Sequence, residues 1–98
     1  MDINKLLKKL GLPNDGRYEN KFYILPIADS NEYAKIYTLL DTNTTNTEFP
    51  SFELNTNSNL DKMVNYFETT LDNTTYNFFL IGDLVNDNYY LKIGEKQE

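Results

Sequence analysis

Apolar residues recur along the first ten positions with the period of an α-helix. They stand at i, i+3, i+4 and i+7 and so share one helical face: Ile3, Leu6, Leu7 and Leu10. Asp2 is a suitable N-cap, and Gly11 stands where a glycine C-cap is expected. The pattern predicts a short amphipathic helix over residues 3–10.

Two stretches that follow are rich in aromatic and β-branched residues, which favour strands. In residues 21–27, Pro26 has no amide hydrogen to donate, which indicates a strand at an edge of the sheet or near its own end. In residues 33–40 the side chains alternate between two faces. Because residues 29–32 have the composition of a turn, we expect these two strands to form a hairpin.

The best-marked helix is predicted over residues 58–72, after a short strand at 49–54. Ser58 and Asp61 resemble a capping box in which Asp replaces the usual Glu. Apolar residues then recur at helical spacing along one face: Leu60, Met63, Val64, Phe67 and Leu71.

The last third of the chain predicts two further strands, over residues 76–82 and 88–93, and a frayed charged tail over 94–98. The prediction is therefore a single α+β domain spanning residues 1–98. It has a mostly antiparallel sheet of four to five strands and two helices, in the order α-β-β-β-α-β-β.

The composition argues against catalysis. The chain has no Cys and no His, which removes thiolate chemistry, zinc sites built on these residues and imidazole acid–base catalysis. Four scattered glycines form no phosphate-binding loop. Asp83 and Asp87 flank a predicted turn that lacks the pattern of a calcium loop. We expect no enzymatic activity, no cofactor and no metal.

The cellular location of the protein is predicted from its apolar runs, its N-terminus and its lack of cysteine. No apolar run approaches the roughly 18 residues that a membrane helix needs. The N-terminus intersperses lysines among its leucines, unlike a signal peptide. Together with the absence of cysteine, these features predict a cytoplasmic protein that does not contact a membrane.

Charge is distributed unevenly. The formal net charge is −6, and residues 22–98 alone carry twelve acidic and four basic groups. Such a domain repels nucleic acid and attracts basic surfaces. Lys8 and Lys9 fall in the last turn of the first predicted helix, where cations favour the helix dipole. We therefore expect a protein partner with a basic surface and no direct binding of nucleic acid.

The outer face of the second predicted helix is the first candidate site. Its polar residues follow at spacings of four, three and four, opposite the apolar stripe, and two of its carboxylates oppose the helix dipole. Asp83 and Asp87 extend this acidic surface. In the fifth predicted strand, Tyr89 and Tyr90 point to opposite sheet faces, so one of them faces away from the helices. The candidate partner-binding residues are Asp61, Asn65, Glu68, Asp72, Asp83, Asp87 and Tyr90.

The overall profile resembles that of phage-encoded inhibitors, including anti-CRISPR and anti-restriction proteins. Residue types with AT-rich codons, namely Asn, Ile, Lys, Tyr, Phe and Met, supply 44 of the 98 residues. The chain is also small and acidic, with no catalytic motif. The resemblance implies a protein of host–virus interaction that blocks a basic nucleic-acid-processing enzyme by protein–protein contact.

The sequence leaves three other interpretations. One is a small enzyme that uses carboxylates and tyrosine. The α-β-β-β-α order predicted for residues 1–72 resembles a double-stranded-RNA-binding domain, but the basic surface that such a domain needs is missing. The alternative function is that of a structural or adaptor protein that self-associates through an exposed tyrosine-rich sheet face. Monomer and homodimer are both compatible with the sequence.

Overall fold

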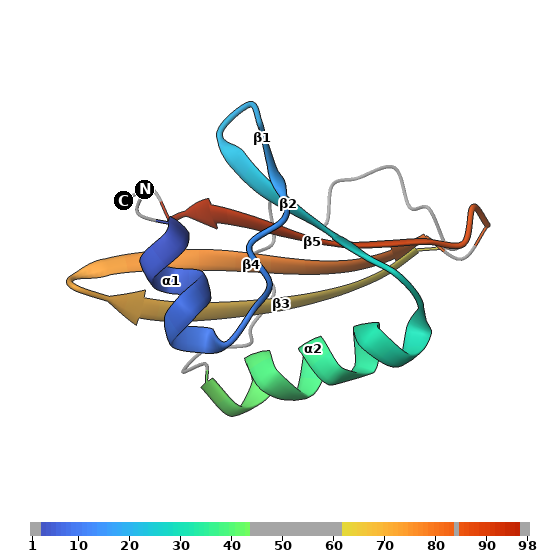
Figure 1. Cartoon of the computed structure of the whole chain (residues 1–98), viewed down its shortest axis with the longest axis horizontal. Helices are drawn as coiled ribbons and strands as arrows, with labels where there is room; N and C mark the ends of the chain where they lie inside the picture. Colours follow the sequence, from blue (N-terminus) through green and yellow to red (C-terminus); the bar gives the residue numbers. More distant parts are fainter. Residues whose placement is uncertain (1–2, 44–61, 84, 97–98) are drawn as a thin grey trace.

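The computed structural model describes residues 3–43, 62–83 and 85–96. Its elements are α1 (Ile3–Leu10), β1 (Arg17–Glu19), β2 (Phe22–Ile27), α2 (Ser30–Asn43), β3 (Lys62–Leu71), β4 (Thr74–Asp83) and β5 (Asn88–Glu95). Within this part of the chain, five antiparallel strands form one sheet in the order β1-β2-β5-β4-β3 (Figure 1). The predicted fold class, α+β with two helices and an antiparallel sheet, is confirmed.

Helix α1 forms where its apolar period predicts it. All four residues of its apolar face are buried. Gly11 adopts a φ of 78°, and the amide of Leu12 donates to the carbonyl of Leu7 at 2.9 Å. This six-to-one hydrogen bond is that of a Schellman C-cap, which needs a left-handed residue at the position that glycine occupies. The proposed N-cap, Asp2, lies outside the described residues.

The strand predicted over residues 33–40 is wrong, because this segment belongs to helix α2. Asp29 Oδ1 accepts a hydrogen bond from the amide of Glu32 at 2.9 Å, which caps the helix. Tyr33, Ile36 and Leu40 are buried at helical spacing. Residues 29–32, which have the composition of a turn, therefore cap a helix instead. As a result, the second helix follows two strands and not three.

The helix predicted over residues 58–72 is also wrong, because its described part is strand β3. The strand pairs with β4 along its whole length, from Lys62 opposite Asp83 to Leu71 opposite Thr74. Asp72 and Asn73 close this hairpin with φ values of 52° and 66°, as a two-residue turn with two left-handed residues requires. The predicted strand at 49–54, together with Ser58 and Leu60, lies outside the described residues.

The core lies between the two helices and one face of the sheet. Even-numbered residues of β4 and odd-numbered residues of β2, β3 and β5 point into it: Tyr23, Leu25, Ile27, Phe67, Tyr76, Phe78, Leu80, Leu91 and Ile93. Phe78, Leu80, Leu91 and Ile93 have no exposed surface. Phe78 and Leu80 therefore lie in an inner strand of the sheet, on the face that packs against the helices.

Strand β2 pairs with β5, not with residues 33–40 as predicted. Among the described residues, its other side pairs with the three residues of β1, a strand that was not predicted, and Pro26 lies beyond that pairing. The tail predicted to fray from residue 94 is ordered as far as it is described. Gly94 and Glu95 belong to β5, and the amide of Lys96 donates to the carbonyl of Thr75 at 2.8 Å.

Candidate functional site

The two helices pack against one face of the sheet. We call the opposite face the second face. Strand register aligns one row of residues across it: Arg17, Ile24, Lys92, Phe79 and Tyr66. A neighbouring row contains Pro26, Tyr90, Ile81 and Val64. The second face therefore mixes aromatic, aliphatic and cationic side chains.

A hollow of about 390 Å³ opens on this face over β1, β2 and β5. We call it the groove, and the lining residues that matter below are Arg17, Phe22, Ile24, Pro26, Tyr90 and Lys92. Arg17 and Pro26 are exposed, whereas the other four are half-buried. The closed end of the β1–β2 hairpin rises away from β3, β4 and β5, whereas the rest of β2 pairs with β5 (Figure 1). The groove therefore offers apolar side chains next to charged and polar ones, and solvent reaches it.

Lys92 is the cation at the floor of the groove. Its Nζ lies 4.1 Å from the centre of the Phe22 ring and 5.9 Å from that of Phe79. Phe22 takes this position by lying over Gly94, where any β-carbon would come within 2.7 Å of the ring. Cation–π attraction therefore holds the ammonium group on the second face.

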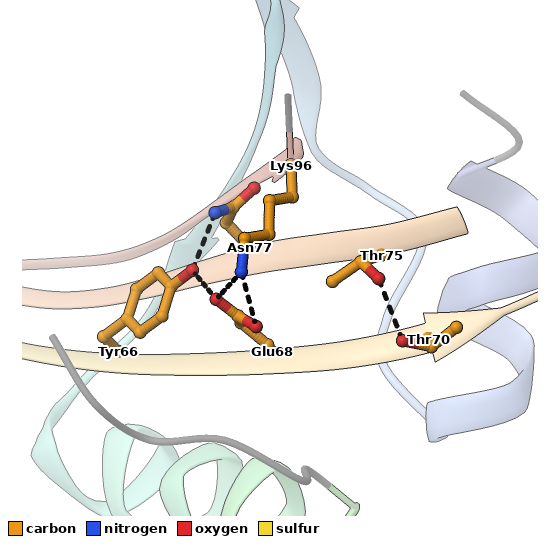
Figure 2. A network of polar contacts seen from close by, with 6 residues as sticks. All are labelled: Tyr66, Glu68, Thr70, Thr75, Asn77 and Lys96. Carbon is orange, nitrogen blue, oxygen red and sulfur yellow. Dashed lines mark hydrogen bonds and ion pairs between the residues drawn. The ribbon is translucent and has the colours of Figure 1, made fainter. Parts of the chain in front are cut away.

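A second feature of the second face lies away from the groove, on β3 and β4. It is a polar network that is buried except for Lys96 (Figure 2). The Tyr66 hydroxyl donates to Glu68 Oε2 at 2.5 Å and accepts a hydrogen bond from Asn77 Nδ2 at 2.7 Å. Lys96 Nζ lies 3.3 Å from one Glu68 carboxylate oxygen and 3.2 Å from the other. We call these four residues the Tyr66–Glu68 network. It joins the end of β5 to the edge strand β3.

The network accounts for a charge that would otherwise be costly to bury. Glu68 is 7% exposed, and an ionised carboxylate in such a place needs hydrogen-bond donors and an opposite charge. Tyr66 supplies the first and Lys96 the second. Because the carboxylate is held by these groups, we interpret Glu68 as part of the structure of the sheet rather than as a docking residue.

Four carboxylates gather at one end of the molecule, which we call the acidic end: Asp29, Glu32, Asp83 and Asp87. Ile27 pairs with Tyr89 and Asp83 pairs with Asn88, so the start of α2 and the β4–β5 turn lie together at this end (Figure 1). Asp83 Oδ2 accepts a hydrogen bond from Asn86 Nδ2 at 2.9 Å, and Asp87 has a φ of 49°. Local hydrogen bonding therefore holds the Asp83 carboxylate in place.

The predicted acidic helical face does not exist, because its described residues belong to a hairpin. Asn65 points to the helix side of β3 and donates to the Tyr33 hydroxyl at 2.9 Å. Glu68 points to the second face and is buried. Asp72 lies in the β3–β4 turn, where it forms an ion pair with Lys5 of α1. The hydrogen bond from Lys5 lowers the pKa of Asp72. Asp61 lies outside the described residues.

The remaining predicted residues take part in the two surfaces described above. Asp83 and Asp87 belong to the acidic end, and Tyr90 lines the groove while Tyr89 packs against the core. The prediction that one tyrosine of this pair faces away from the helices is confirmed. Asp29 and Lys92 were missed. The Asp-x-x-Glu spacing of a capping sequence signals the first, and alternation with Tyr90 along β5 signals the second.

Among the described residues, no three carboxylates come close enough together to hold a metal ion. No helix in this part of the chain is long and apolar enough to cross a membrane. The chain matches no protein-family model, no curated protein and no solved structure.

Proposed function

We propose that the protein is a non-catalytic binding domain whose acidic end docks on a basic surface of a protein partner. The type of action is that of a phage-encoded inhibitor that blocks a nucleic-acid-processing enzyme in the cytoplasm. The observation that carries the proposal is the gathering of Asp29, Glu32, Asp83 and Asp87 at one end of the sheet. The net charge of −6 adds to the attraction at longer range.

The local structure of the acidic end suits recognition of cations. Asp29 caps α2, and Asp83 accepts a hydrogen bond from Asn86, so contacts within the chain position both carboxylates before another protein binds. Preorganised groups lose little conformational entropy on binding. Opposite charge on a partner then speeds association, and salt weakens this effect because the Debye length is only about 8 Å at physiological ionic strength.

The test uses two double variants that change the net charge equally. Asp83→Asn with Asp87→Asn removes two charges from the acidic end. Asn keeps a hydrogen-bond acceptor at position 83 and tolerates the left-handed backbone at position 87. Asp15→Asn with Asp41→Asn removes two exposed charges elsewhere and is the control.

The partner is first captured from host lysate at low salt with the wild-type protein and identified by mass spectrometry. Its association rate is then measured at low and high salt. We expect the acidic-end variant to associate at least about threefold more slowly at low salt, and the control to keep nearly the wild-type rate. If both variants slow association equally, or if neither does, the acidic end is not the docking site.

A further inference from the structure

The groove carries a positive charge in an otherwise acidic protein. Among its charged lining residues, Arg17 Nη2 lies 3.5 Å from Glu19 Oε2, so the charges of this pair offset each other. Lys92 contacts the rings of Phe22 and Phe79 and forms an ion pair with none of the described carboxylates. The ammonium group of Lys92 therefore gives the groove its net charge.

We propose that the groove binds an extended peptide segment of a partner, in which an acidic side chain precedes or follows an apolar one by two residues. The acidic side chain pairs with Lys92, and the apolar side chain packs on Tyr90 and Pro26. This surface is distinct from the acidic end and takes ligands of the opposite charge, so the inference does not depend on the proposed function.

The spacing of the lining residues carries the choice of an extended peptide. Lys92 and Tyr90 are two residues apart on the same face of β5, and their partners across the groove floor are Ile24 and Pro26. Same-side residues of an extended chain recur every 6.6 Å or so, which equals the repeat of the strand beneath. A peptide lying along β5 thus brings one side chain to Lys92 and the next same-side one to Tyr90.

Charge and surface chemistry determine which side chains fit. The described contacts of the Lys92 ammonium group are aromatic rings. An acidic side chain of the peptide would therefore provide its negatively charged partner. A basic side chain at the same place would meet the ammonium group of Lys92 and be repelled. Beside the cation, Ile24, Pro26 and the ring of Tyr90 offer apolar surface that is half-buried or exposed. An acidic residue alone would leave this surface uncovered, which is why the motif needs an apolar residue as well.

The probe is an acetylated, amidated peptide of sequence Gly-Glu-Gly-Phe-Gly, compared with the same peptide carrying Gln in place of Glu. Binding to the ¹⁵N-labelled full chain is followed by NMR chemical-shift changes at the amides of Ile24, Tyr90 and Lys92. We expect the Glu peptide to bind about threefold to fivefold more tightly, which is the effect of one partly exposed ion pair. The preference should shrink when the Debye length falls from about 30 Å to about 3 Å between roughly 0.01 M and 1 M salt.

Two variants locate the preference. Lys92→Met keeps an apolar stem over Phe22 without the charge and should bind both peptides equally. Lys35→Met removes one exposed charge from α2, on the other side of the sheet, and should keep the wild-type preference. The double variant Asp83→Asn with Asp87→Asn should also keep it, so failure of the acidic-end proposal leaves this result unchanged.

Several outcomes would overturn the inference. They are equal binding of the two peptides by the wild-type protein, shift changes at other amides alone, or a preference that survives Lys92→Met. Concentration-dependent shifts at the same amides without peptide would show instead that a second copy of the chain occupies the groove. If Lys92→Met does not fold, the comparison of the two peptides on the wild-type protein at low and high salt still decides.

Discussion

Replacing Tyr66 by Phe tests how much the Tyr66–Glu68 network contributes to stability. The change removes one hydroxyl group and keeps the ring, which is 3% exposed and packs against Phe79 with a centroid distance of 5.0 Å. Apolar burial is therefore almost unchanged. What is lost is the donor to Glu68 and the acceptor for Asn77.

The size of the effect follows from the two hydrogen bonds. A hydrogen bond to a charged group contributes about 1.5–3 kcal/mol, and one between neutral groups about 0.5–1.5 kcal/mol. Lys96, whose side chain is 46% exposed, still pairs with the carboxylate and limits the penalty. We expect Tyr66→Phe to lower the free energy of unfolding by about 2–3 kcal/mol. For a domain of this size that corresponds to a fall in Tm on the order of 10 °C.

The assay is urea denaturation followed by circular dichroism, with a double-mutant cycle that adds Glu68→Gln. The control is Tyr37→Phe, which removes a hydroxyl from an exposed tyrosine that packs its ring on Phe67. We expect the control to change stability by less than about 0.5 kcal/mol. A coupling energy between Tyr66 and Glu68 below about 0.5 kcal/mol would refute the reasoning, since interacting pairs in one network should exceed it.

Two further measurements address the core. Phe67→Ala should cost about 3–5 kcal/mol in urea denaturation, because Phe67 is 2% exposed, whereas Met63→Ala, at a 40% exposed position, should cost far less; similar losses would contradict the burial pattern of β3. Burial raises the pKa of Tyr33 above its ordinary value of 10.0, so the folded protein binds a proton that the unfolded chain releases. The contribution of Tyr33 to the free energy of unfolding is therefore fully present below about pH 10 and is lost as the pH rises above it. Tyr33→Phe should make the Tm less sensitive to pH between about pH 9 and pH 11.

The segments that mislead sequence interpretation are those whose apolar residues satisfy two periods at once. In residues 33–40, Ile36 and Leu40 fit both an alternating strand and a helix. The helix forms because Asp29 caps it and because Tyr33 reaches the carbonyl of Leu80 in β4, at 3.2 Å. The second contact is distant in sequence and cannot be read from local composition.

The opposite error occurs in residues 62–71. Met63, Phe67 and Leu71 recur every four residues and suggest a helical stripe, but the same three also alternate onto one face of a strand. Pairing with β4 decides between them, and it depends on residues that follow the segment in the sequence. Because this segment is a strand and not a helix, the candidate site residues are arranged differently from the prediction. Carboxylates predicted on one helical face are divided between a buried network and a turn.

Features that depend on residues close together in the sequence were predictable. The glycine cap of α1, the two C-terminal strands and the opposite orientations of Tyr89 and Tyr90 follow from local spacing. The groove was not predictable, because it needs the register between β2 and β5 that brings Ile24 beside Lys92.

The pairing of β2 with β5 has a consequence for the order in which the chain folds. Tyr23 pairs with Ile93, so the first part of the sheet meets its neighbour only when the last described strand has been synthesised. Strands β3, β4 and β5 pair in sequence order and form early by comparison, since closing short loops is fast. Until β5 is complete, β2 pairs with β1 alone, and Leu25, which is buried in the complete fold, lacks its partner across the sheet, Leu91. Docking of the β1–β2 hairpin onto β5 should therefore be a late step of folding.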